Sequence, residues 1–159
     1  MGYFISKAYE ELRLLGVEEN IKRNWEKFYE PDLQKAFTSH KQMLWYRYLN
    51  YQKERGWILD FYPLSKVVRK VGKVGDKEYI YYPDFEVEYP FGNVLHEIIW
   101  GKTSRTFFLF LKENKFELLF IDRKMVKDVI TTFSPVIDFS HRQLERKDIV
   151  SGRHYKHFR

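Results

Sequence analysis

Two neighbouring acidic segments constrain this chain more than any other part of its sequence. In the first, Asp84, Glu86 and Glu88 alternate with apolar residues, so they lie on one face of an extended strand. A turn-like Pro-Phe-Gly-Asn sequence then leads into a second run, in which Glu97 is surrounded by apolar residues. Partly buried carboxylates that lie close together raise one another's pKa unless a cation neutralises them, so these acids predict a divalent metal site. Because the donors are all oxygens, we expect Mg²⁺ or Mn²⁺ rather than zinc.

The features around these acids follow a distinctive order. Pro83-Asp84 closes one strand, Glu97 lies in the next, a lysine follows closely, and a helix leads to an apolar strand at residues 116–121. Over residues 39–122 this order resembles the core of the PD-(D/E)xK nuclease superfamily. That superfamily includes phage and archaeal resolvases, phage head-completion nucleases and viral cap-snatching endonucleases. The resemblance implies an enzyme, a metal-dependent endonuclease of phage or viral origin that hydrolyses phosphodiester bonds.

The resemblance also implies roles for the acids. Asp84 and Glu97 are expected to bind Mg²⁺ or Mn²⁺ with the help of the Ile98 carbonyl, and Glu86 to hold a second ion. A metal in this position lowers the pKa of a bound water and offsets charge that develops on the phosphate. Asp60, in a predicted strand at residues 58–62, is either a further acid near the metal or an exposed residue of an edge strand.

The basic catalytic residue departs from the usual pattern. The superfamily lysine normally stands two residues after the acid, where this chain has Ile99, so Lys102 or Lys112 would have to orient the water or stabilise the oxyanion. Many members also carry a glutamate early in the preceding helix, where this chain has His40. Cap-snatching enzymes resemble the chain in both respects. We therefore add His40 to the two lysines as a candidate catalytic residue.

The charge balance points to a polyanionic partner. With 28 Lys and Arg against 22 Asp and Glu, the net charge is +6, which attracts nucleic acid but also serves solubility alone. We expect nucleic acid as the partner, with DNA favoured over RNA, bound through its backbone with little sequence preference. The candidate contacts lie on a predicted hairpin and at the start of the following helix: Lys66, Arg69, Lys70, Lys73 and Arg105.

Periodicity and turn residues predict an α+β fold. We expect a mixed or mainly antiparallel sheet of about four to five strands with helices packed against it. Residues 1–159 should form a single domain, with a helical part at 1–56, a sheet core at 57–122 and a basic part at 123–159. The predicted helices are 7–15, 21–28, 40–55, 105–114 and 123–130. A hairpin is expected to turn at residues 72–76, and 116–121 to form a buried central strand.

Several classes of function are excluded or left open. The absence of cysteine excludes disulfides, thiolate zinc sites and thiol catalysis. The chain has no apolar run of membrane-spanning length, so we expect an intracellular, cytoplasmic protein without a membrane partner. Gly101-Lys102-Thr103 lacks the earlier glycine of a phosphate-binding loop. A catalytically inactive nucleic-acid-binding or virion-associated protein, a polymerase-associated or packaging protein, and a homodimer all stay open.

Overall fold

The computed structural model describes residues 2–7, 29–30, 35–36, 39–64, 69–99 and 101–140. Its strands are β1 (Tyr3–Ser6), β2 (Tyr29–Glu30), β3 (Lys35–Ala36), β4 (Asp60–Pro63), β5 (Lys70–Val74), β6 (Lys77–Tyr82), β7 (Phe85–Tyr89), β8 (Gly92–Ile98) and β9 (Leu118–Ile121). Its helices are α2 (His40–Glu54), α3 (Arg105–Asn114) and α4 (Arg123–Phe133). The described strands and helices confirm the predicted α+β class.

Two sheets organise the described residues. The first has the strand order β1-β6-β5 and is antiparallel throughout. The second has the order β4-β7-β8-β9, in which β9 runs parallel to β8 and the other neighbours are antiparallel. The four-stranded mixed sheet matches the predicted strand number, while the three-stranded sheet is an additional layer. The short strands β2 and β3 pair with each other.

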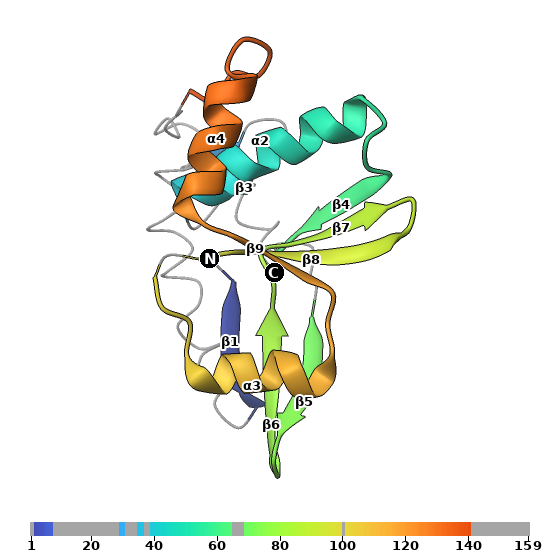
Figure 1. Ribbon diagram of the computed structural model, residues 1–159, viewed down its shortest axis with the longest axis vertical. Helices are drawn as coiled ribbons and strands as arrows, with labels where there is room; N and C mark the ends of the chain where they lie inside the picture. The colour runs from blue at the N-terminus through green and yellow to red at the C-terminus, as the bar shows by residue number, and fades with distance from the viewer. Residues whose placement is uncertain are drawn as a thin grey trace, which may run out of the picture.

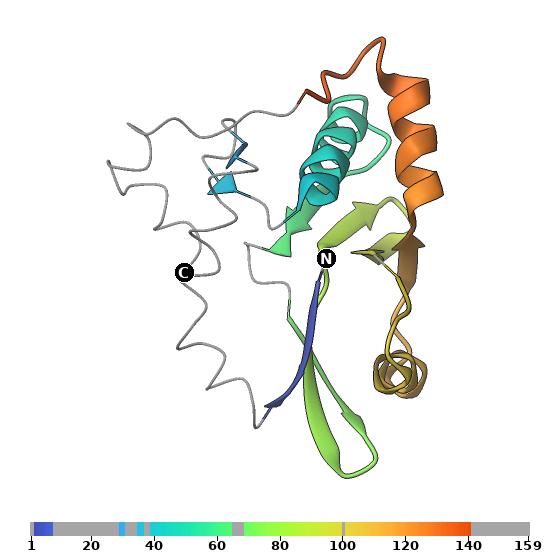
Figure 2. The same cartoon turned by 90° about the vertical axis from the view of Figure 1, so that its left-hand side faces the viewer.

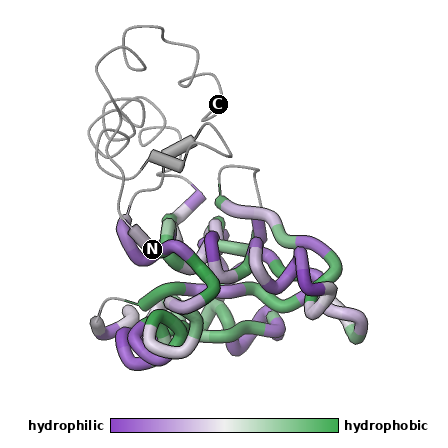
Figure 3. The backbone as a smooth tube through the Cα atoms, turned by 90° about the horizontal axis from the view of Figure 1, so that it is seen from above, coloured by the Kyte–Doolittle hydropathy of each residue, from purple (hydrophilic) through white to green (hydrophobic). Residues whose placement is uncertain are grey.

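Helices cover both sides of the four-stranded sheet. The α2 and α4 helices pack on one side, around a core that includes Leu49, Val87 and Val126 (Figure 1). The α3 helix lies beside β5 and the other sheet, where Phe107 and Phe110 form a second core (Figure 2). Hydrophobic and hydrophilic stretches alternate along the chain (Figure 3), as expected when each element buries one face.

The two best-predicted helices begin at local caps. The Ser39 hydroxyl accepts the backbone N–H of Gln42 at the start of α2, and Gly56 follows the end of that helix with φ +77°. The Ser104 hydroxyl accepts the N–H of Phe107 at 3.1 Å, and α3 has the predicted bounds. These capping contacts need only neighbouring residues, so the sequence alone is enough to place them.

Three predictions of local structure need correction. The predicted hairpin is present as β5 and β6, but its turn is shorter than predicted and comprises residues 75–76 alone. Gly72 belongs to β5, where a side chain would collide with Phe110 and Asn114 of α3. Strand β9 is the last in the order of the described sheet rather than a central strand; it is apolar because helices cover both of its faces. The N-terminal part begins with β1, which pairs with β6, instead of being wholly helical.

Several predictions fall on residues that the structure does not describe. The predicted helix at 21–28 and the basic C-terminal part beyond residue 140 lie outside the described residues, as does the predicted helix at 7–15 apart from Lys7. Lys66 also lies outside them. The predicted helix at 123–130 is present as α4 and continues to Phe133.

Candidate functional site

Asp84 and Glu97 lie near each other at one end of the β7–β8 ladder, close enough for the charge of Asp84 to act on Glu97. Phe85 pairs with His96 in this antiparallel ladder, and one further step in the same register brings Asp84 opposite Glu97. Both acids are buried, with 1% of Asp84 and 5% of Glu97 exposed. The structure thus brings together two of the three acids that the sequence suggested as metal ligands.

Asp84 is held by donors from two different elements. The side-chain amide of Gln42, in the first turn of α2, donates to Oδ1. The backbone N–H of Ile98 donates to Oδ2 at 2.7 Å. Asp84 stands in a bend before β7, so the strand alternation that orients Glu86 does not apply to it. A carboxylate has about four lone-pair positions, so these hydrogen bonds leave further acceptor capacity.

Glu97 accepts hydrogen bonds from two other segments. The Tyr81 hydroxyl donates to Oε2 at 2.6 Å, and the backbone N–H of Gly2 donates to Oε1 at 3.1 Å. Burial and the charge of Asp84 raise the pKa of Glu97 to about 8, although both hydrogen bonds act in the opposite direction. Burial and the neighbouring Glu97 also raise the pKa of Tyr81. Most Glu97 side chains therefore carry a proton near neutral pH when no cation is bound.

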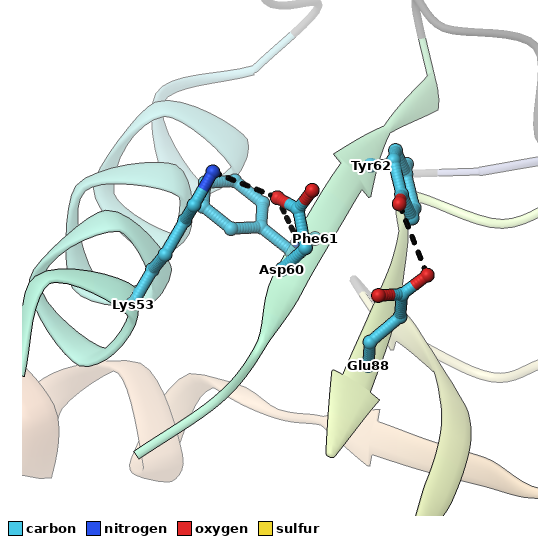
Figure 4. A network of polar contacts seen from close by, with 5 residues as sticks. All are labelled: Lys53, Asp60, Phe61, Tyr62 and Glu88. Carbon is cyan, nitrogen blue, oxygen red and sulfur yellow. Dashed lines mark hydrogen bonds and ion pairs between the residues drawn. The ribbon is translucent and has the colours of Figure 1, made fainter. Parts of the chain in front are cut away.

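Glu86 and Glu88 have partners of their own. Lys70 Nζ lies 3.2 Å from Glu86 Oε1, and both side chains are partly buried. The Tyr62 hydroxyl donates to Glu88 Oε1 at 3.0 Å (Figure 4). The hydrogen bond to Glu88 raises the pKa of Tyr62 to about 12. These contacts separate both glutamates from the pair formed by the other two acids.

Asp60 is also engaged elsewhere. Lys53 Nζ lies 2.9 Å from Asp60 Oδ1, which also accepts the backbone N–H of Phe61 at 2.8 Å (Figure 4). The hydrogen bond from Lys53 lowers the pKa of Asp60. Across the described ranges, no three His, Asp or Glu side chains gather into a group able to hold a metal ion. A metal site here would therefore rest on two carboxylates, with water or substrate completing the ligands.

A cavity of about 400 Å³ opens beside Glu97. It lies between β1, the end of β8 and the start of α3, and its lining includes Tyr81, Lys102 and Phe107. Lys102 is exposed and shares the cavity with the acid. Lys112 is exposed in the last turn of α3 and does not line this cavity. Of the two candidate lysines, only Lys102 lines the cavity that contains Glu97.

The contact between α2 and the acids comes from a residue that sequence reasoning missed. His40 is the first residue of α2 and is partly buried, but the side chain that reaches Asp84 belongs to Gln42, two positions later. The spacing of Ser39 and Gln42 is that of a capping box. That spacing indicates a polar residue at the helix start, and the side-chain amide of Gln42 donates to Asp84 from there.

Tyr81 and Gly2 are the other residues that the sequence did not reveal. Tyr81 is fully buried, and among several neighbouring tyrosines nothing in the pattern singled it out. Gly2 lies so close to the acid that a Cβ atom there would be 2.5 Å from Glu97 Oε2. The two residues of that contact are 95 positions apart, so no local motif signals it.

A buried histidine, His96, directly precedes Glu97 in β8 and therefore points to the opposite face of the strand from Glu97. Trp45 Nε1–H donates to Nδ1 of His96 at 3.0 Å, so the ring proton lies on Nε2, which is 3.0 Å from the Tyr89 hydroxyl. Burial lowers the pKa of His96 to about 4. This neutral histidine joins α2 to the sheet, since its partners come from α2 and β7.

The described candidates for nucleic-acid contact are spread over two elements. Lys73 and Arg105 are exposed, as is Arg69, and Lys70 is paired with Glu86 as described above. Lys73 also exchanges backbone hydrogen bonds with Asn114 of α3, at 3.4 and 3.2 Å. The hairpin is therefore fixed against α3, with the Lys73 side chain exposed.

None of the helices in the described ranges combines the length and apolarity of a membrane span.

Comparison of the chain with protein families, curated proteins and solved structures found no match.

Proposed function

We propose that the protein is a Mg²⁺- or Mn²⁺-dependent nuclease whose metal lies at Asp84 and Glu97. The observation that carries the proposal is the proximity of two buried acids, of which Glu97 lines a cavity together with a lysine. Ionising both acids is unfavourable without a cation, because burial and the charge of Asp84 raise the pKa of Glu97 to about 8. A divalent cation would stabilise the doubly ionised pair.

The donor set suits a small, hard cation. Mg²⁺ is commonly bound by one or two carboxylates together with water and substrate phosphate, so two acids are sufficient. The donors are carboxylate oxygens, and the cavity beside Glu97 leaves room for a phosphate. When bound, the metal would lower the pKa of a water and offset the charge of the transition state.

The surrounding residues would position the acids and the phosphate. Gln42 and the Ile98 N–H fix Asp84, while Tyr81 and Gly2 fix the orientation of Glu97. Lys102 would neutralise the phosphate oxygen that gains charge, or orient the attacking water.

The order of elements around the acids also supports the proposal. The α3 helix connects the parallel strands β8 and β9, so a helix is the next element in the chain after the strand that carries Glu97. The sequence resemblance to the PD-(D/E)xK nucleases implied this order of acid, helix and apolar strand.

A cleavage assay tests this function. Linear, supercoiled and branched DNA should be cut with Mg²⁺ or Mn²⁺ and left intact with EDTA. Glu97→Gln should abolish cleavage, whereas Glu117→Gln, which neutralises an exposed acid outside the cavity, should leave it unchanged. Lys102→Ala should reduce turnover much more than Lys112→Ala. The nuclease proposal fails if DNA stays intact with both Mg²⁺ and Mn²⁺, or if Glu97→Gln is fully active.

A nucleic-acid-binding protein without catalysis is the second candidate. Ile99, in place of the superfamily lysine, favours it, as do the two hydrogen bonds that hold Asp84 without metal. Calorimetric titration with Mn²⁺ separates the two functions. Saturable binding that Glu97→Gln removes supports the enzyme, while DNA binding with no uptake of Mn²⁺ supports the inactive binder.

A further inference from the structure

We infer that the cavity beside Glu97 takes a single unpaired nucleotide of a nucleic-acid strand. The inference rests on the proposed function, since it names the form of substrate that reaches the acids. It starts from the volume of the cavity, about 400 Å³. That volume is within the range of roughly 300–1,000 Å³ that small-molecule sites usually have.

The cavity has a polar end and an apolar wall. Lys102, Thr103 and Ser104 line it where the chain enters α3. Phe4 of β1 and Phe107 of α3 also line it, with ring centroids 5.1 Å apart. A nucleotide has the same division, because its phosphate is anionic and its base is a flat, largely apolar ring.

The polar end suits the phosphate. The ammonium of Lys102 is exposed and provides a positive charge at the entrance. The first turn of the ten-residue helix α3 adds backbone N–H groups, which favour an anion. Gly101 leaves this entrance open, because a Cβ atom there would have no neighbour within 4 Å.

The apolar wall suits the base. Phe4 and Phe107 are in contact with each other, so a base would lie against their combined surface and not between the rings. Glu97 lies in the same cavity and would place the acid pair beside the phosphate of this nucleotide. A base stacked and paired in a duplex cannot enter, so the substrate must offer an unpaired nucleotide, as in a single strand, a flap or a branch point.

Binding measured in EDTA tests the cavity without requiring catalysis. The probes are deoxyadenosine 5′-monophosphate, deoxyadenosine and inorganic phosphate, followed by nuclear magnetic resonance of the labelled full-length protein. The mononucleotide should bind more tightly than either fragment and shift the signals of Thr103 and Phe107. Lys102→Ala should weaken its binding about tenfold, as expected for the loss of a charge-assisted contact. Lys112→Ala removes the same charge outside the cavity and should change affinity less than about twofold.

A second measurement uses a strand that contains the fluorescent base 2-aminopurine. The single strand should bind with a change in fluorescence that Lys102→Ala reduces, while the same sequence in a duplex should bind without that change. Any one of three results would overturn the inference. The two lysine variants could lose affinity for the mononucleotide equally, inorganic phosphate could bind as tightly as the mononucleotide, or the duplex could show the same fluorescence change as the single strand. Cleavage by the enzyme without mononucleotide binding would overturn the cavity assignment alone. Mononucleotide binding without any cleavage would sustain the cavity and end the nuclease proposal.

Discussion

The backbone N–H of Ile98 donates to Oδ2 of Asp84 at 2.7 Å. Since Ile98 directly follows Glu97, this hydrogen bond fixes the distance between the two acids through one residue of backbone. The other oxygen of Asp84 accepts from Gln42, so each oxygen of this carboxylate accepts from a neutral donor. Glu97 instead accepts from the backbone N–H of Gly2 and from the Tyr81 hydroxyl, and a hydroxyl can act as either donor or acceptor. The two acids should therefore respond differently to neutralisation.

Asp84→Asn should lower the stability of the metal-free protein. An asparagine amide places an N–H₂ group where one of the two donors now points, so a buried donor loses its acceptor. The expected loss is about 1–3 kcal/mol in the free energy of unfolding. Glu97→Gln should change it by less than about 1 kcal/mol near pH 7, because Glu97 is already mostly protonated there and the Tyr81 hydroxyl can accept from the new amide.

Urea unfolding in EDTA measures both variants against the wild type. The comparison is informative because each substitution replaces a buried carboxyl group by the corresponding amide at neighbouring positions. If both variants lose stability equally, Glu97 has a structural role like that of Asp84, and the metal site loses its main support.

The stability of the metal-free protein should decline as pH rises from about 6.5 to about 8. The pKa of Glu97 is raised from 4.5 to about 8, so its contribution is complete below 4.5 and is lost as pH rises through 8. The pKa of His96 is lowered from 6.5 to about 4, so its contribution is present above 6.5 and is lost as pH falls through 4. Between 4.5 and 6.5 the two slopes oppose each other and should leave a plateau.

Glu97→Gln provides the control for this pH profile. Without the Glu97 contribution, stability should rise from about pH 4 to 6.5 by up to about 1.4 kcal/mol per unit and then stay level. Denaturant unfolding at half-unit steps of pH measures the two profiles. A wild-type profile that stays flat above pH 6.5 would contradict the raised pKa of Glu97.

The sequence predicted features that depend on neighbouring residues better than features that depend on residues far apart in the chain. The helices that begin after Ser39 and Ser104 were predicted well because their caps are formed by residues three positions away. The turn of the β5–β6 hairpin was predicted too long, because Gly72 was assigned to the turn whereas it lies in the strand, packed against α3 more than thirty positions later. The pairing of β1 with β6 is also between distant segments, and nothing near β1 indicates it.

The same distinction applies to the candidate site. The sequence suggested Asp84 and Glu97 from local pattern, and the β7–β8 register places them together. It also grouped Glu86 with them on the basis of strand alternation, but Asp84 stands in the bend before β7, and Lys70 engages Glu86. Partners such as Gln42 reach the acids only through tertiary packing, which a single sequence does not display.

Gly2→Ala should destabilise the protein by about 1–3 kcal/mol, because the added Cβ would collide with both the backbone carbonyl of Tyr82 and the Glu97 carboxylate. Gly101→Ala is the matched control: its Cβ would have no neighbour within 4 Å, so little change in stability is expected. Thermal unfolding of both variants in EDTA measures the difference. Equal melting temperatures for the two variants would show that β1 does not hold Glu97 in the way described.

Binding to nucleic acid should depend strongly on salt. The basic residues are distributed over a hairpin and a helix, so binding should come mainly from release of counterions by phosphate contacts. For a handful of contacts, affinity should drop at least about tenfold between roughly 50 and 200 mM salt. Lys73→Ala should reduce the slope of this dependence by about one counterion if its exposed side chain contacts a phosphate. Fluorescence anisotropy in EDTA measures the slope, and an affinity indifferent to salt would contradict electrostatic binding.

Mn²⁺ should raise the melting temperature of the wild type, because an ion that binds only the folded state stabilises it. At a concentration about 100 times the dissociation constant, the gain in free energy is about 2.7 kcal/mol. Glu97→Gln should lose most of this gain, because it removes one of the two neighbouring carboxylates proposed to bind the ion. Glu86→Gln is the informative control, since that side chain is paired with Lys70 and lies apart from the two acids. It should keep the Mn²⁺ effect. A wild type that ignores Mn²⁺ would remove the metal site, while loss of the effect in Glu86→Gln would show that the ion binds nearer to the Lys70 pair than to Glu97.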